Sequence, residues 1–198
     1  MFDPLLPYDH LPLLPTNFNY DQVQLLKQVN KSNIALAKLN IRAEKIPNSF
    51  LLVSPLLVRE SVASSGIENI HTTVEAVFAA ELLQKERRSG PEKEVLHYRD
   101  AMLYGLEIIG KKRQLGIKDI IALQAIVEPD HAGLRKQQVK IIDHTSREIL
   151  FTPPSPPKLL SLLENLADII NDPSMDIDPL MKAAVIHYQF ECIHPFSD

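Results

Sequence analysis

The stretch AAVIHYQFECIHPFSD, residues 183–198, determines most of what the sequence predicts. It has no proline or glycine before Pro195, and apolar residues fall on nearly every side of the helix expected to begin at Pro179. A central, buried helix is therefore predicted. His194 and Asp198 follow it, on either side of Phe196. By itself His194 reads as a structural helix cap, whereas a functional reading makes His194 a general base and Asp198 an oxygen ligand for a hard cation.

Outward from this stretch, helical spacing of apolar residues predicts a series of further helices. They are expected at residues 21–44, from Pro55 onward, and within 71–88, 91–110, 117–129 and 158–171. Thr72 and Glu75 are expected to form a capping box. The segments Val139–Ile142 and Ile149–Phe151 are β-prone and predict a hairpin. The fold class is therefore mainly α, a helical bundle with one small β-hairpin.

Apolar stripes and prolines predict how two of these segments pack. The stripe of the helix in 91–110 consists of Val95, Tyr98, Met102, Leu106 and Ile109. Prolines at positions 4, 7, 12 and 15 exclude a regular helix at the start of the chain. That segment is expected to lie extended on the surface, with Leu5, Leu11 and Leu14 against the body.

The composition excludes several classes of protein. The 198 residues carry a formal net charge of −4, which argues against a protein that coats nucleic acid. The proline-interrupted N-terminus lacks the basic start of a signal peptide, and no apolar run is long enough to span a bilayer. The single cysteine, Cys192, suits a reducing compartment. A cytoplasmic protein with no membrane and no evident nucleic-acid partner is expected.

Beyond these derivations, the chain resembles the Fic (Fic/Doc) family. HPFSD after an apolar helix resembles the first half of the signature HPFx[D/E]GNGRxxR. AGLRKQQVKII and ILFTPPSPPKLLSLLENL resemble the approach to the family's flap hairpin and the proline-rich exit from it. SSGIEN matches the inhibitory pattern [S/T]xxxE[G/N] through Ser64, Glu68 and Asn69. The resemblance implies a Fic-type helical bundle with a β-hairpin flap, as an N-terminal extension with the inhibitory helix (1–90) and a Fic core (91–198).

The resemblance also implies an activity. Fic enzymes transfer AMP from ATP to a hydroxyl side chain of a target protein, which makes ATP and Mg²⁺ the expected substrate and cofactor. His194 would be the catalytic base, and Asp198 would hold the metal at the nucleotide. The target would bind along the flap at about 138–152, and self-modification and a homodimer remain open. Transfer of another phosphate-linked group, or removal of AMP, also remains open.

Glu68 has two interpretations. The resemblance implies an inhibitory glutamate that faces the ATP phosphate site and pairs with the last arginine of the signature, with Ser64 and Asn69 as neighbouring regulatory positions. The alternative is a purely structural role, in which Ser65 and Glu68 form a capping box at a helix start.

The sequence departs from the family at one point: it stops at Asp198, and the GNGRxxR half of the signature is absent. The expectation is a chain truncated within the signature, either as a fragment or as a natural truncation, and a poor transferase by itself. The alternative is a non-catalytic helical protein-binding module derived from a Fic fold.

Overall fold

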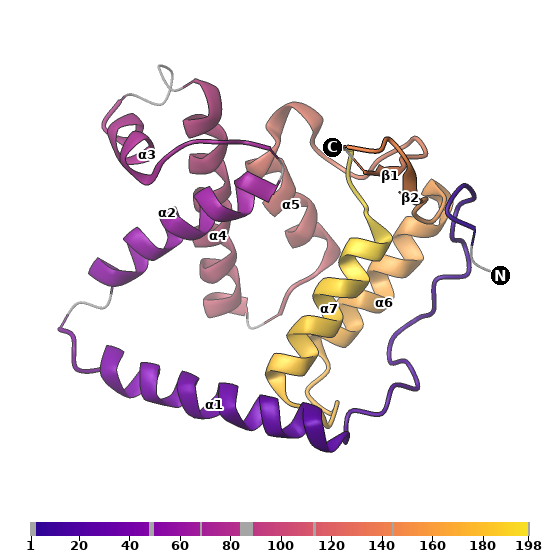
Figure 1. Cartoon of the computed structure of the whole chain (residues 1–198), viewed down its shortest axis with the longest axis horizontal. Coiled ribbons are helices and arrows are strands. Elements are labelled where there is room, and N and C mark those ends of the chain that lie inside the picture. The colour runs from indigo at the N-terminus through magenta and orange to yellow at the C-terminus, as the bar shows by residue number, and fades with distance from the viewer. Residues whose placement is uncertain are drawn as a thin grey trace. The chain divides into compact units, whose positions relative to one another are not determined.

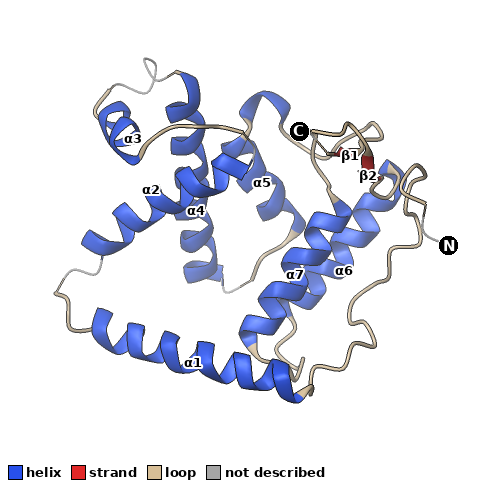
Figure 2. Ribbon diagram, viewed as in Figure 1, coloured by secondary structure: helices blue, strands red, loops and turns tan. Residues whose placement is uncertain are grey.

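The computed structural model describes residues 3–47, 50–67, 69–83, 89–112, 114–143 and 145–197. Over these ranges the chain is mostly helical, with one two-stranded antiparallel sheet (Figures 1 and 2). The predicted fold class is confirmed. Among the described helices, none combines the length and the apolar character needed to cross a bilayer.

A helix is present at each predicted position, and except at two starts described below the bounds lie close to the expected ones. The helices are α1 (Val23–Ala43), α2 (Phe50–Ile67), α3 (Val74–Glu81), α4 (Gly90–Lys112), α5 (Ile117–Val127), α6 (Leu159–Asn171) and α7 (Pro179–Ile193). Two short 3-10 turns are η2 (Pro129–His131) and η3 (Pro156–Lys158). The hairpin strands are β1 (Ile141–Ile142) and β2 (Ile149–Phe151), with a register irregularity between the two residues of β1.

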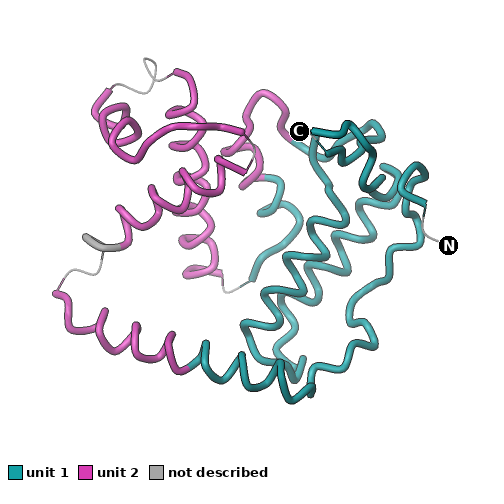
Figure 3. Tube along the Cα trace, in the orientation of Figure 1, with its two compact units in different colours: residues 1–33, 114–121, 133–198 teal, residues 34–113, 122–132 magenta. Residues whose placement is uncertain are grey.

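The chain divides into two compact units, which Figure 3 shows in different colours. Unit 1 consists of residues 1–33, 114–121 and 133–198, and it contains the hairpin, α6 and α7. Unit 2 consists of residues 34–113 and 122–132, and it contains α2, α3 and α4. His194 therefore belongs to unit 1, whereas Ser64 and Asn69 belong to unit 2.

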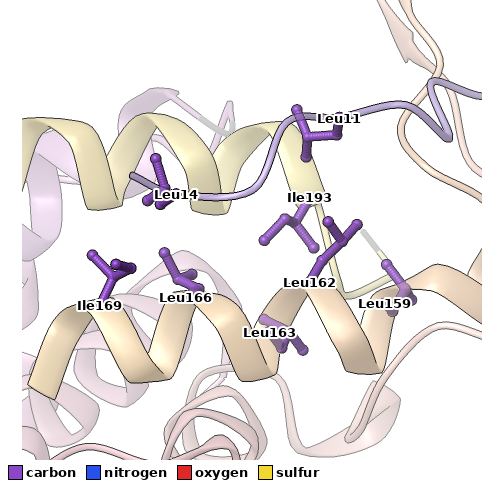
Figure 4. Packing of buried hydrophobic residues seen from close by; sticks show 8 residues of the cluster. All are labelled: Leu11, Leu14, Leu159, Leu162, Leu163, Leu166, Ile169 and Ile193. Atoms are coloured by element: carbon purple, nitrogen blue, oxygen red, sulfur yellow. The ribbon is translucent and has the colours of Figure 1, made fainter. Parts of the chain in front are cut away.

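Helix α6 supplies most of the core of unit 1. Its leucines recur at intervals of three and four residues, which places them on one face. Leu163 on this face is completely buried, whereas Leu160 on the opposite face is 54% exposed. The buried cluster, shown in Figure 4, consists of Leu11, Leu14, Leu159, Leu162, Leu163, Leu166, Ile169 and Ile193.

The N-terminal strap, defined here as residues 3–15, is hydrogen-bonded to α6 and α7. The side-chain amide of Asn165 donates to the carbonyl of Leu14 and accepts from its N–H, both at 2.9 Å. Gln189 Nε2 donates to the carbonyl of Pro12 at 2.8 Å. Leu11 and Leu14 are buried, as predicted, but Leu5 is exposed. That part of the prediction is wrong because residues 3–6 form a turn, closed by a backbone hydrogen bond, and do not continue the extended path.

Unit 2 is built on α4, which packs against α2 and α3. Its buried apolar cluster consists of Val58, Val77, Val95 and Leu96. Arg99 is also buried, and its guanidinium forms ion pairs with Glu81 at 2.6 Å and Asp100 at 2.8 Å. This cation therefore has the carboxylate partners that a buried charge normally requires.

Two predicted helix starts are wrong. Helix α2 begins at Phe50, so Pro55 lies inside it and not in its first turn. The five residues before Pro55 contain no proline or glycine, so they are compatible with an additional helical turn, although Pro55 itself cannot donate the hydrogen bond of an interior helical residue. Helix α3 is capped by Thr73, whose hydroxyl accepts from the N–H of Ala76 at 3.1 Å, while the Thr72 hydroxyl donates to Glu92.

Two predicted helix faces are also wrong. Leu106 and Ile109 of α4 are exposed, although the predicted stripe included them. Helix α7 is not buried on all sides, because Tyr188 is 71% exposed. An apolar pattern shows which residues can be buried, but it does not show on which side of a helix a neighbour lies.

Candidate functional site

Helix α7 ends at the residue that the sequence predicts. His194 is its C-cap and adopts the left-handed conformation, with φ 45° and ψ 67°. The N–H of His194 donates to the carbonyl of Phe190 at 2.9 Å, the last hydrogen bond of the helical pattern. Pro195 has no N–H and cannot continue the helix. The main chain therefore turns out of the helix at the proposed base.

The turn after His194 is anchored on both sides. Pro195 is fully buried, and the ring of Phe196 packs against Phe190 of α7 with centroids 6.1 Å apart and an interplanar angle of 55°. The carbonyl of Pro195 accepts a hydrogen bond from the main-chain N–H of Arg135 at 2.9 Å. These contacts fix the path of residues 194–196 as the chain leaves α7, and the role of Phe196 is to pack against the helix.

Arg135 is the residue of this site that sequence reasoning missed. It is 3% exposed, and its Nε donates to the carbonyl of His194 at 2.7 Å. Burial lowers the pKa of this guanidinium. The only signal in the sequence is its place in AGLR immediately before the flap, and nothing in that segment indicates a contact 59 residues away.

The flap hairpin has its base next to the same turn. Gln138 Nε2 donates to the carbonyl of Pro153 at 2.8 Å and so joins the two ends of the hairpin. The N-terminal strap holds the exit from β2, because the N–H of Tyr8 donates to the carbonyl of Thr152 at 3.0 Å. The Thr152 hydroxyl donates to the carbonyl of Pro4 at 2.6 Å. The predicted hairpin is therefore present, and the strap supports it.

The described residues do not supply a metal site by themselves. No group of three or more His, Cys, Asp or Glu side chains that could hold an ion occurs among them. Asp198, the predicted metal ligand, lies outside the described residues. The role of Asp198 as a ligand for Mg²⁺ therefore stays a prediction.

The predicted inhibitory motif lies at the end of α2. Ser64, in the last turns of the helix, donates its hydroxyl to Glu60 Oε1 at 2.9 Å. Asn69 is in the left-handed region, with φ 61°. Its N–H donates to the carbonyl of Gly66 at 3.3 Å, and the N–H of Ile70 donates to that of Ser65 at 3.0 Å. This pair of bonds is a Schellman motif, which requires a left-handed residue at the position of Asn69 and so explains why Gly or Asn fits there.

The same geometry tests the capping box proposed for Ser65 and Glu68. Ser65 lies in the last turn of α2, and the next helix begins only at Val74. A capping box at a helix start is therefore the wrong interpretation of Ser65 and Glu68. Glu68 itself lies outside the described residues.

A second concave feature lies in unit 1. This groove of about 710 Å³ is formed by the N-terminal segment, β2 and α7, and its lining includes Tyr8, Phe18, Tyr20, Tyr188 and Cys192. Burial raises the pKa of the Cys192 thiol, in keeping with the packed, unreactive thiol that its place in an apolar helix favours. The described part of the lining contains no lysine or arginine, so it offers no cation to pair with a phosphate.

Comparison with known proteins identifies both halves of the chain. A family model described as Fic/DOC family N-terminal matches residues 26–107, and a model described as Fic/DOC family matches residues 114–198. In structure, the chain is similar to a Fic family protein from Desulfovibrio desulfuricans G20, with a TM-score of 0.61 and 22% identity. The match covers 93% of this chain and 55% of that one, and at this identity it supports the fold alone.

Curated relatives carry a functional name. The chain is 35% identical over 91 residues to "Protein adenylyltransferase fic-1" of Caenorhabditis elegans and 32% identical over 111 residues to "Protein adenylyltransferase Fic" of Drosophila willistoni. These alignments cover 43% and 53% of this chain, but only 16% and 21% of the relatives. The chain thus spans about a fifth or less of the length of the relatives that it matches.

Proposed function

Because the chain belongs to the Fic/DOC family, we propose that it carries the front half of the active site of a protein adenylyltransferase. The reaction moves AMP from ATP to a hydroxyl side chain of a target protein. The observation that carries the proposal is the turn at His194, which is fixed at the end of α7 and hydrogen-bonded to the base of the flap through Arg135.

His194 is the proposed base. It accepts the proton of the target hydroxyl while the hydroxyl oxygen attacks the α-phosphorus of ATP, the bond to the β-phosphate oxygen breaks, and pyrophosphate leaves. A positioned general base contributes about 10²–10⁴-fold to such a step. Asp198 is the proposed ligand for Mg²⁺, which, when bound, neutralises phosphate charge.

The flap is the proposed target site. An extended segment of the target adds to the hairpin by main-chain hydrogen bonds, and this mode tolerates many sequences. The carbonyl of Thr152, immediately after β2, already accepts a hydrogen bond from the N–H of Tyr8 in the N-terminal strap. The outer edge of β1 is therefore the better place for a target strand. A cytoplasmic location, suggested by the single cysteine, belongs to this proposal.

Autoinhibition is assigned to Glu68. The Schellman bonds at the end of α2 join Asn69 to Gly66 and Ile70 to Ser65. A carboxylate carried at such a helix end can pair with a phosphate-binding arginine and so disturb the productive pose of ATP. The 198 residues contain no GNGRxxR segment. They therefore lack that arginine and the glycine-rich anion site, and should transfer AMP weakly.

The test is an intact-mass and labelled-ATP assay with Mg²⁺ on two versions: the 198-residue chain, and one that continues through GNGRxxR. The longer version should gain one AMP, and His194→Ala should slow the gain by about 10²–10⁴-fold. A different mass shift would identify another transferred group, and loss of AMP from a modified target would identify removal.

Three outcomes would contradict parts of the proposal. Equal rates with and without His194 would exclude its role as the base. Robust, His194-dependent labelling of the 198-residue chain would contradict the requirement for GNGRxxR. Complete absence of transfer by the longer version would favour the non-catalytic binding module.

A further inference from the structure

The buried Arg135 is surrounded by main-chain carbonyls. Its Nε donates to His194 O at 2.7 Å, Nη1 to Gln137 O at 3.1 Å, and Nη2 to Pro154 O at 2.5 Å, with a longer contact to Ile193 O at 3.5 Å. None of these acceptors is charged. Arg99, the other buried arginine in the described ranges, instead has two carboxylate partners. Structural ion pairing therefore explains Arg99 but not Arg135.

The position of Arg135 at the end of α7 has an electrostatic reason. The last carbonyls of a helix lack helical partners and carry the negative end of its dipole. Ile193 and His194 contribute two of these carbonyls, and the guanidinium contacts both. This interaction offsets part of the cost of burying the cation.

His194 needs such support because its backbone conformation is unfavourable. A positive φ costs about 1–2 kcal/mol for a residue with a Cβ. A following proline also disfavours helical conformations and normally holds the preceding residue extended. His194 has φ 45° and precedes Pro195. Such a residue persists only where its surroundings fix it, and two of the fixing bonds come from Arg135, to the carbonyls of His194 and Pro195.

The same guanidinium also contacts both ends of the flap. Gln137 immediately precedes the hairpin, and Pro154 follows it in the buried Thr152–Pro154 exit. A planar fork with five N–H groups can reach acceptors on three separate segments, whereas a lysine ammonium offers three donors from a single nitrogen. Arg135 is therefore the one side chain through which α7, the flap entry and the flap exit are jointly bonded in the described residues.

From this geometry we propose that Arg135 is a positioning residue: it holds His194 in its left-handed conformation and keeps it in register with the flap that presents the target hydroxyl. The inference rests on the proposed function for its catalytic meaning. Because Arg135 is buried and its side-chain donors are directed at main-chain carbonyls, we assign it no direct contact with the substrate.

The test compares Arg135→Lys with Arg99→Lys, a matched change at a buried arginine of unit 2. The first readout is NMR of isotopically labelled histidine and of the His194 amide in the 198-residue chain. With Arg135→Lys, the His194 signals should shift or broaden, and exchange of its amide should rise about tenfold from the loss of one hydrogen bond to a charged group. Arg99→Lys should change neither signal.

The second readout is kinetic, in the version that continues through GNGRxxR. Arg135→Lys should lower kcat by about 10²-fold through misplacement of the base, with little change in the KM for ATP. Arg99→Lys should leave both near the parent values. A folded Arg135→Lys protein with parental His194 signals and parental kcat would overturn the positioning role.

A third measurement covers the case in which Arg135→Lys does not fold. In the unsubstituted chain, the Nε–H of Arg135 should be protected from exchange to a degree similar to the His194 amide, because one opening event frees both. Exchange of that Nε–H at the rate of an exposed arginine would overturn the proposal. If the longer parent transfers no AMP, the proposed function fails, while the NMR comparison still decides the positioning role.

Discussion

Left-handed residues other than glycine occur at three places in the described ranges: Asn69, Arg147 and His194. Arg147 belongs to the flap turn, where Asp143 organises the chain by accepting hydrogen bonds from the N–H groups of Thr145 and Ser146. The other two are the residues that close the two helices bearing the predicted functional motifs. Each motif thus ends its helix on a conformation that most side chains avoid.

At the residue scale, Asp9 makes the attachment of the strap depend on pH. Its carboxylate accepts hydrogen bonds from the Ser155 N–H and hydroxyl, both at 2.7 Å. These bonds, the backbone one first, hold the pKa of Asp9 below its ordinary value. A lowered pKa in the folded state means that the stabilisation is complete above about pH 4 and is lost as the pH falls further.

Asp9→Asn should therefore reduce the protection of the Tyr8 amide at pH 7 and leave it nearly unchanged near pH 2–3. Because the carboxylate is exposed, the effect at pH 7 should be only about 0.5–1 kcal/mol. Asp172→Asn is the matched control, since Asp172 accepts the same two kinds of bond from Ser174 within a local turn that includes no residue of the strap. A Tyr8 amide that responds equally to both changes would contradict the assignment.

At the element scale, α6 combines an apolar face with two asparagines that act as main-chain partners. Asn165 pairs with both backbone groups of Leu14, and Asn171 pairs with both backbone groups of Leu115 at 2.8 and 2.9 Å. A side-chain amide provides one N–H donor and one carbonyl acceptor to the main chain, as the backbone of a neighbouring β-strand does. One helix thereby fixes two irregular segments far apart in sequence.

The end of α2 gives a prediction of its own. Asn69→Ala should destabilise the protein by about 1 kcal/mol, because alanine tolerates a positive φ poorly. Asn69→Gly should be close to neutral, since glycine adopts this conformation readily. Urea unfolding followed by circular dichroism measures both. Equal destabilisation by alanine and glycine would show that the asparagine side chain, and not its backbone conformation, matters.

The sequence could predict the elements better than their ends and contacts. Periodic leucines located α6, and the proline after His194 located the end of α7, because both signals are local. Adjacent Thr72 and Thr73 carry the same chemistry, so the true cap of α3 could not be chosen. The resemblance placed Arg135 in the AGLR segment before the flap, but its role could not be predicted. That role depends on carbonyls from three segments that only the fold brings together.

At the scale of the whole molecule, the regulatory glutamate can be tested only where its partner is present. In the version that continues through GNGRxxR, Glu68→Gly should raise self-modification by about fivefold or more, the usual lower range of a regulatory coupling. Labelled-ATP incorporation measures it. Glu75→Gln, at an exposed glutamate in the first turn of α3, is the control and should have no effect. Unchanged labelling with Glu68→Gly would argue against autoinhibition by Glu68.

The strap also has a consequence for synthesis on the ribosome. Leu14 is held by a residue 151 positions later in the chain. At roughly 5–20 residues per second, about 8–30 s pass between the synthesis of Leu14 and that of its partner. Throughout that interval the apolar strap has no core to join. Its four prolines prevent it from forming a regular strand, so they also keep the nascent segment from pairing with its neighbours.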